Sequence, residues 1–254
     1  MVRSRVHRKI LGVIPARYAS SRFPGKALAK VDLRTMLEHV HERVSMARYL
    51  TSVIVATDDR RIADEARRFG ARVKMTREDH VSGTDRVAEV ASAFEDFELV
   101  VNIQGDEPTL SPDFFPPLLD LFGRPEVEVS TLAVRCPPEE FTNPNAVKVV
   151  TALDGRALYF SRATIPFDRD GIGFAGYRKH LGIYAYRKAA LERFAALPPS
   201  PLEKLERLEQ LRLLENEIDI YVADAPRDTI GVDTEEDLAR AEAMLKDDAS
   251  RSGT

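Results

Sequence analysis

The segment from Ile10 to Lys26, ILGVIPARYASSRFPGK, gives the first indication of the fold. Its opening residues, Ile10–Ile14, are apolar and have the length of a buried strand. The loop that follows carries Arg17, Arg22 and Lys26 with two serines and a Pro-Gly pair. Backbone N–H groups and fixed cations in such a loop can surround a phosphate group without bulky side chains intruding. The stretch therefore predicts a strand followed by a phosphate-binding loop.

This loop differs from two common nucleotide-binding motifs. A Walker A loop requires G-x-x-x-x-G-K-[S/T], but position 20 is serine and position 27 is alanine. The loop also lacks the dinucleotide fingerprint G-x-G-x-x-G. Taken alone, its Gly-Lys pair favours the alternative of a solvated basic loop with a Pro-Gly turn, because short motifs often match by accident.

Beyond this loop, apolar strand-like runs alternate with amphipathic stretches of helical period. Strands are predicted at 10–14, 52–59, 97–104, 127–134 and 218–224, and helices at 35–47, 60–70, 84–94, 111–122, 201–217 and 233–245. Thr84 or Asp85 is the expected N-cap of the third helix. The alternation predicts an α/β fold with a mixed, mostly parallel sheet flanked by helices. We expect a single domain over 1–254, with a smaller lobe at about 135–215 that is rich in proline, glycine and aromatic residues.

Composition limits the classes of protein. The chain has 254 residues, 44% hydrophobic residues and a net charge of −4, which is ordinary for a globular protein and argues against nucleic-acid binding. No apolar stretch reaches the roughly 20 residues that cross a bilayer, and the N-terminus does not resemble a signal peptide. The single cysteine, Cys136, excludes an intrachain disulfide. These features predict a cytoplasmic location and no membrane partner.

Two aspartates follow separate predicted strands. Asp106 lies in NIQGDEP and Asp233 lies in GVDTEEDL. Ligands of such sheets bind beyond the carboxyl ends of the strands, and two carboxylates there can hold Mg²⁺ against phosphate oxygens. The alternative is that each aspartate only caps a turn or helix, and Asp233 in particular fits an N-cap.

Several segments together resemble the 3-deoxy-manno-octulosonate (Kdo) cytidylyltransferase family, over residues 10–245. They are, in order, IPARYASSRFPGKAL, VATDD, SGTDR, NIQGDEP, NPNAVKVV, YFSRATIPFDRD, HLGIYAY, PLEKLERLEQLRLLE and GVDTEEDL. The resemblance implies a nucleotide-diphosphosugar-transferase fold with Rossmann-like order and a homodimer that pairs through the smaller lobe. It also implies a Mg²⁺-dependent reaction of CTP with Kdo, which gives pyrophosphate and CMP-Kdo for lipopolysaccharide synthesis.

The resemblance also implies roles for individual residues. Arg17, Arg22 and Lys26 match the triphosphate-binding loop, and Ser82, Arg86 and Asp106 also match nucleotide-binding positions. Asp106 and Asp233 match the metal ligands and, with Lys26, form the catalytic group. Sugar contacts are implied for Gln104, Arg162, His180, Tyr184, Glu209 and Gln210. For each of these residues a purely structural role is the alternative. Since no histidine is obviously placed as a general base, activation of the sugar hydroxyl by the metal is the simpler mechanism.

Some features leave alternatives open. Gly171–Lys179 is shorter than the matching stretch of many relatives, and Lys179 stands where an arginine is common. The sugar could therefore be a related acidic sugar, such as 8-amino-8-deoxy-Kdo or a sialic acid. A glycosyltransferase would use a D-x-D motif, which GDEP is not. A non-catalytic nucleotide sensor would not need the metal and sugar residues together.

Overall fold

The computed structural model describes residues 8–19 and 23–252, and its chain divides into two compact units. The first unit combines Met1–Pro112 with Thr229–Thr254, and the second spans Asp113–Asp228. The second unit is therefore wider than the lobe predicted at 135–215. The arrangement as a single domain stays a prediction.

Apart from a two-stranded hairpin, the strands of the first unit pair in parallel. Strand β1 (Ile10–Pro15) pairs on one side with β6 (Leu99–Asn102) and on the other with β4 (Ser52–Thr57), and β4 also pairs with β5 (Arg72–Met75). Every residue from Ile10 to Ile14 is buried, as expected for a parallel strand covered on both faces. The predicted strands at 10–14, 52–59 and 97–104 are present, whereas β5 was not predicted from the sequence.

The helices of the first unit begin at polar caps. They are α1 (Met36–Ser45), α2 (Arg60–Arg68), α3 (Gly83–Ser92) and α8 (Glu235–Ser252). Asp59 caps α2 by accepting the N–H of Arg61 at 2.8 Å. Helix α3 begins after Ser82, which forms a capping box with Asp85, so the prediction of Thr84 or Asp85 as its N-cap was wrong. Because the Ser82 hydroxyl reaches the N–H three residues on, the helix starts earlier than its apolar period indicates.

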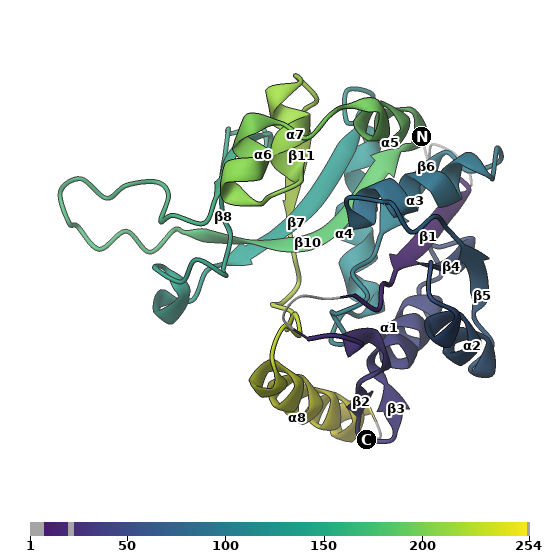
Figure 1. Ribbon diagram of the computed structural model, residues 1–254. Coiled ribbons are helices and arrows are strands. Elements are labelled where there is room, and N and C mark those ends of the chain that lie inside the picture. The colour runs from purple at the N-terminus through teal and green to yellow at the C-terminus, as the bar shows by residue number, and fades with distance from the viewer. Residues whose placement is uncertain (1–7, 20–22, 253–254) are drawn as a thin grey trace, which may run out of the picture. The chain divides into compact units, whose positions relative to one another are not determined.

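A small hairpin follows the opening loop. The loop ends in the short 3-10 helix η1 (Lys26–Leu28), and strands β2 (Lys30–Val31) and β3 (Arg34–Thr35) then form the hairpin. Helix α8 lies beside β2 (Figure 1), where Val31 and Met36 pack with Val232 and Ala241 in one buried cluster. The C-terminal segment is thereby held against the segment that follows the loop.

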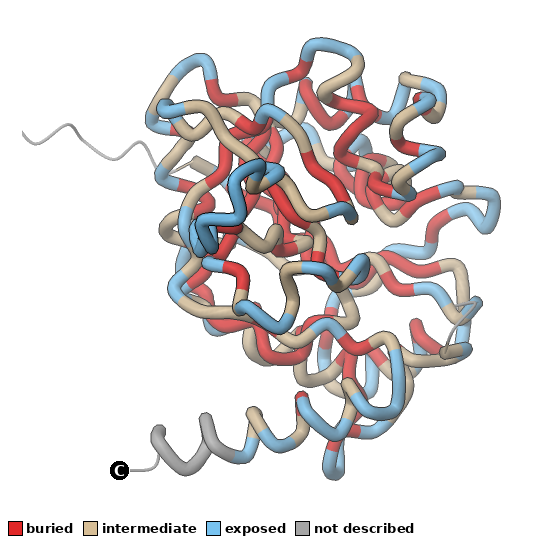
Figure 2. Tube along the Cα trace, turned by 90° about the vertical axis from the view of Figure 1, so that its left-hand side faces the viewer, coloured by how far each residue is buried: buried red, intermediate tan, exposed pale blue. Residues whose placement is uncertain are grey.

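The second unit has a mixed sheet. Its strands are β7 (Val129–Arg135), β8 (Lys148–Thr151), β9 (Ala157–Ser161), β10 (Arg178–Arg187) and β11 (Ile220–Asp224). Strand β7 pairs parallel with β11 and antiparallel with β10, while β8 pairs antiparallel with β10 and β9. Its helices are η2 (Pro112–Phe114), which begins at the boundary between the units, α4 (Phe115–Asp120), η3 (Leu121–Gly123), η4 (Pro138–Glu140), α5 (Lys188–Ala196), α6 (Pro201–Glu206) and α7 (Gln210–Glu215). Figure 2 shows buried (red), intermediate and exposed (pale blue) stretches interspersed along the trace.

The single helix predicted at 201–217 is instead two helices, α6 and α7. The chain breaks at Arg207, which adopts a left-handed conformation with φ 53°. Arg212 Nε donates to Glu203 Oε2 at 2.8 Å, and both side chains are almost fully buried. In an unbroken helix, residues nine apart lie on opposite sides and about 13 Å apart along the axis. The break therefore allows this buried pair to form.

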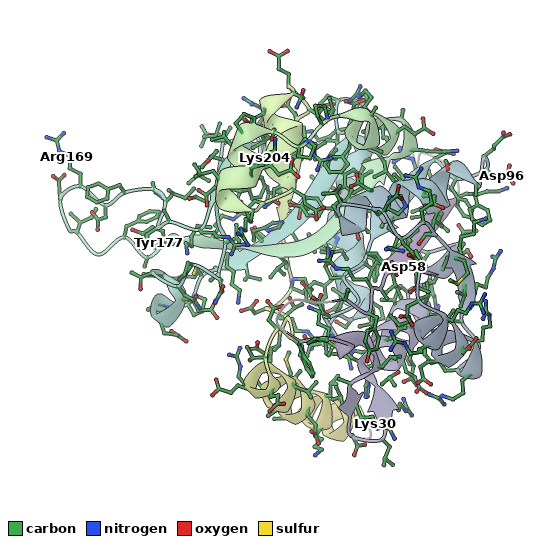
Figure 3. The ribbon with its side chains drawn as sticks, in the orientation of Figure 1. Lys30, Asp58, Asp96, Arg169, Tyr177 and Lys204 are labelled. Carbon is green, nitrogen blue, oxygen red and sulfur yellow. The ribbon has the colours of Figure 1, made fainter. Side chains whose placement is uncertain are left out.

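A long loop joins β9 to β10. In Figure 1 it extends away from β8 and β10, and in Figure 3 Arg169 lies at its far end and Tyr177 near its base. The Asp168 carboxylate accepts three consecutive N–H groups, from Ile172, Gly173 and Phe174, at 3.0 to 3.2 Å. These backbone bonds, that of Phe174 foremost, lower the pKa of Asp168.

Candidate active site

Three predicted catalytic side chains converge in the first unit. The Lys26 ammonium donates to the Asp106 carboxylate and lies 3.3 Å from Asp233 Oδ1. It also lies 3.3 Å from the carbonyl oxygen of Val232. The side chains of Lys26 and Asp106 are 18% and 28% exposed, so ligands can still reach the cluster. The structure thus brings together a cation and two carboxylates from three separate parts of the chain.

Backbone contacts explain why Asp106 and Asp233 meet. The N–H of Val232 donates to the carbonyl oxygen of Asp106 at 2.9 Å. The N–H of Ile230 donates to Thr109 Oγ1 at 2.8 Å. The segment before α8 is therefore fastened along the segment after β6, and the two aspartates become neighbours.

Gly105 brings the same segment close to the end of β1. A Cβ atom at Gly105 would lie 3.1 Å from the carbonyl oxygen of Pro15, which is tighter than an ordinary contact. A side chain at this position would push the loop after β6 away from β1. The glycine therefore allows Asp106 to approach the loop that begins after Pro15.

Asp233 is not the hydrogen-bonding cap of α8. Thr234 Oγ1 accepts the N–H of Asp237 at 3.2 Å, and the Asp237 carboxylate accepts the N–H of Thr234 at 3.0 Å. This reciprocal pattern is a capping box on Thr234. The Asp233 carboxylate instead reaches Lys26, so the interpretation of Asp233 as an N-cap was wrong.

The charges of the cluster reinforce one another. Burial lowers the pKa of Lys26, but the Coulombic attraction and hydrogen bonds of Asp106 and Asp233 outweigh that effect, so the pKa lies above its ordinary value. The ammonium is therefore charged at neutral pH. It occupies the point toward which both carboxylates are directed.

The same two carboxylates suit Mg²⁺. Their carboxylate oxygens are hard donors, the kind that Mg²⁺ binds in proteins. Both carboxylates already contact one cation, the Lys26 ammonium. Among residues 8–19 and 23–252, no group of three or more His, Cys, Asp or Glu side chains is placed to hold a metal. A metal held by Asp106 and Asp233 would therefore complete its coordination with phosphate oxygens and water.

The remaining predicted nucleotide residues have different surroundings. Arg17 is exposed at the start of the loop, and Arg22 lies outside the described residues. Ser82 serves as the N-cap of α3, where Asp85 donates its N–H to the Ser82 hydroxyl at 3.1 Å. The buried Arg86 guanidinium pairs with Asp58 at 3.0 Å and donates to Thr76 Oγ1. Arg86 therefore links α3 to the ends of β4 and β5.

Asp58 was not assigned a role from the sequence. Its carboxylate neutralises Arg86, whose side chain is only 4% exposed. The available signal was its position in VATDD, directly after a buried strand. Carboxylates at such strand ends are frequent in α/β sites, but the sequence alone did not indicate their partner.

The predicted sugar contacts fall in both units. Gln104 lies in the first unit, where its carbonyl oxygen accepts the N–H of Glu107 at 3.4 Å. His180 and Tyr184 are neighbours in β10, with ring centroids 5.3 Å apart. His180 Nε2 lies 3.0 Å from Thr131 Oγ1, and burial lowers the pKa of His180 to about 3. The imidazole is therefore neutral at physiological pH.

Two of these residues present buried polar atoms that have no hydrogen-bond partner among the described residues. They are the Tyr184 hydroxyl oxygen and Gln210 Nε2. Burial also raises the pKa of Tyr184, so the hydroxyl stays protonated. Since buried polar groups are normally paired, these atoms retain capacity for a ligand.

Arg162 and Glu209 are held near the break between α6 and α7. The Arg162 guanidinium donates to the carbonyl oxygens of Glu206 at 2.8 Å and Pro144 at 2.8 Å. Glu209 is the N-terminal flanking residue of α7. Arg162 therefore fastens the end of α6 to the loop before β8, a structural role that the sequence could not distinguish from sugar binding.

The chain matches a family model and curated proteins over most of its length. The model described as cytidylyltransferase matches residues 11–220. A 3-deoxy-manno-octulosonate cytidylyltransferase from Acidobacterium capsulatum is 59% identical over 93% of this chain and 96% of that protein. One from Geobacter sulfurreducens is 48% identical over 93% of this chain and 99% of that protein.

Solved structures share the fold. A CMP:2-keto-3-deoxy-manno-octonic acid synthetase complexed with CTP superimposes with a TM-score of 0.89 and 41% identity, over 94% of this chain and 99% of that one. A 4-diphosphocytidyl-2C-methyl-D-erythritol synthase from Anaerococcus prevotii has a TM-score of 0.63 at 17% identity, over 94% of this chain and 99% of that one, which shows a common fold alone. The predicted fold class is confirmed. None of the described helices has both the length and the apolar character needed to span a membrane.

Proposed function

The chain belongs to the cytidylyltransferase family, and on that basis we propose that it transfers CMP from CTP to the anomeric hydroxyl of Kdo, with release of pyrophosphate. The observation that carries this proposal is the convergence of Lys26, Asp106 and Asp233 on one point. The relatives named above act on Kdo, and the solved structure with 41% identity is complexed with CTP.

In this reaction the basic side chains act on the leaving group. Arg17 and Lys26 would stabilise the negative charge that develops on pyrophosphate, because fixed cations lower the barrier most where charge appears in the transition state. A guanidinium can form two parallel bonds to phosphate oxygens, whereas an ammonium acts as a point charge. Lys26 is already charged and held by its two carboxylates.

Asp106 and Asp233 would hold Mg²⁺, which when bound neutralises charge on the α-phosphate and lowers the pKa of the attacking hydroxyl. The two carboxylates hold the Lys26 ammonium between them. If Asp106 and Asp233 held a metal instead, the ammonium would be available for a phosphate oxygen. Lys26 would then both neutralise the two carboxylates and contact the triphosphate.

The acidic sugar would lie against the second unit. The unpaired Tyr184 hydroxyl and Gln210 amide support this, since a polyol offers partners for both. The neutral His180 imidazole can donate or accept one hydrogen bond but adds no charge. We also place the reaction in the cytoplasm, where CTP is available, and its product in lipopolysaccharide synthesis, as the family resemblance implies.

Pyrophosphate release by the purified protein tests the proposal. The assay contains CTP, Mg²⁺ and one sugar from a panel of Kdo, 8-amino-8-deoxy-Kdo and a sialic acid. We expect release to be fastest with Kdo and to stop when EDTA removes the metal. Faster release with another acidic sugar would make that sugar the substrate in place of Kdo. No release with any sugar would overturn the proposal.

A further inference from the structure

The aromatic ring of Tyr18 contacts two other parts of the first unit. Arg61 Cζ lies 3.3 Å from the centroid of the ring, in a cation–π contact. A Cβ atom at Gly25 would lie 3.0 Å from Tyr18 Cε2, so the ring also packs against the Gly25 backbone. The carbonyl oxygen of Tyr18 accepts the N–H of Gly25 at 2.9 Å. Tyr18 therefore joins α2 to the turn before Lys26.

Asp59 fixes the orientation of the Arg61 guanidinium. Arg61 Nε donates to Asp59 Oδ1 at 3.0 Å, and Nη2 donates to Oδ2 at 2.6 Å. Asp59 is itself fixed, because the same carboxylate caps α2. The Asp59 side chain is 16% exposed, whereas that of Arg61 is 59% exposed. The fork-shaped pairing holds the flat face of this largely exposed side chain against the ring.

The turn at Gly25 leads directly into the candidate active site. Gly25 has φ 72°, a conformation that L-residues seldom adopt, and its carbonyl oxygen accepts the N–H of Leu28 at 2.8 Å. Lys26 follows at once and reaches Asp106 and Asp233. Arg17 directly precedes Tyr18 in the sequence. A shift of Tyr18 would therefore move both cations.

We propose that Tyr18 and Arg61 are positioning residues, which hold Arg17 and Lys26 in the arrangement that receives the triphosphate of CTP. This inference rests on the proposed function for the identity of the ligand. Arg61 would act through Tyr18 rather than through the phosphate, since its guanidinium is paired with Asp59 and stacked on the ring. Without these contacts, part of the binding free energy would be used to bring the two cations into position.

Arg61→Met is the first test, with Arg60→Met as a matched control. Both substitutions remove one positive charge from the first turn of α2, but only Arg61 contacts Tyr18. We expect Arg61→Met to raise the KM for CTP about 2- to 5-fold, the range that an exposed cation–π contact supports. The KM for Kdo and the melting temperature should stay close to those of the wild type. Arg60→Met should leave both KM values unchanged.

Substitutions of Tyr18 separate the ring from its hydroxyl. Tyr18→Phe keeps the ring and should retain the wild-type KM for CTP, whereas Tyr18→Leu should raise it as Arg61→Met does. The double variant Tyr18→Leu/Arg61→Met should be no worse than Tyr18→Leu, because both changes remove the same contact. If the two substitutions raised the KM for CTP additively, Arg61 would not act through the Tyr18 ring.

The inference is overturned if Arg61→Met and Arg60→Met change the KM for CTP equally, or if Arg61→Met raises both KM values together with a lower melting temperature. Calorimetric titration with CTP alone gives a measurement that does not depend on the sugar. If the wild type binds CTP but turns over no acidic sugar, the proposed function fails, and the CTP affinities of the same variants still decide the role of Arg61.

Discussion

The Asp237 carboxylate accepts the main-chain N–H of Asp233 at 3.1 Å, which ties the backbone of Asp233 to the first turn of α8 while its side chain extends to Lys26. The residues at the start of α8 therefore have different roles. Asp237 and Thr234 bond to the N–H groups at the helix start, and the Asp233 carboxylate contributes charge to the site. Variants of the two aspartates should differ accordingly.

Asp233→Asn should reduce turnover about a hundredfold or more with little change in stability. An amide keeps the size of the side chain but loses the charge that would hold Mg²⁺, and loss of about 2.7 kcal/mol of transition-state stabilisation gives this factor. Pyrophosphate release and thermal melting measure the two effects. Asp237→Asn is the control and should lower the melting temperature more than the activity. Near-normal activity of Asp233→Asn would remove Asp233 from the catalytic group.

Lys26→Met should make stability depend on divalent metal. Without the ammonium, Asp106 and Asp233 are left close together with no cation between them, and like charges repel strongly when partly buried. We expect a lower melting temperature in EDTA and a larger increase with Mg²⁺ than the wild type shows. Lys30→Met, at an exposed position of the hairpin, serves as the control. Equal increases in both proteins would show that the ammonium does not share the metal position.

The protein should prefer CTP to ATP and GTP. The family to which the chain belongs and the solved relative complexed with CTP support this preference. Pyrophosphate release at equal concentrations of the three nucleotides measures it. Equal rates with a purine nucleotide would contradict the expectation.

His180 should make the protein less stable in acid. Its pKa is lowered to about 3 by burial, whereas an unfolded histidine titrates near 6.5. Between these values the unfolded chain binds one more proton than the folded one, so stability is complete above about pH 6.5 and falls as the pH drops toward 3. The slope is at most about 1.4 kcal/mol per pH unit. Urea unfolding of His180→Gln from pH 7 to pH 4 should show a shallower decline than the wild type, and an unchanged slope would assign the pH dependence to other groups.

The homodimer stays a prediction, and light scattering at micromolar concentration should give twice the mass of one chain. Apolar side chains stand exposed in the second unit, including Leu205 at 79% and Leu158 at 53%. Tyr184, in the smaller lobe through which the family resemblance implies pairing, is only 6% exposed. A monomeric mass would contradict the dimer.

Local patterns were sufficient where structure depends on neighbouring residues. The apolar run at Ile10–Ile14 predicts β1, and the helical period of residues 60–70 predicts α2. The break at Arg207 could not be predicted, because it accommodates the tertiary pair of Glu203 and Arg212. The residues of the candidate site were identified from motifs and resemblance. By contrast, the pairing of Arg86 with Asp58 could not be predicted, because it depends on how α3 packs.

The loop between β9 and β10 is closed by its own Asp168, whose carboxylate accepts the N–H groups of residues 172–174. The segment from Asp168 to Phe174 is therefore held by bonds within the loop, and the strand registers on either side are set by pairing of β8, β9 and β10. Arg169, at the far end of the loop in Figure 3, is therefore a suitable position for a fluorescent label attached to a side chain, because the backbone between Asp168 and Phe174 keeps its length. Such a label would leave both chain ends untouched and would lie outside the paired strands.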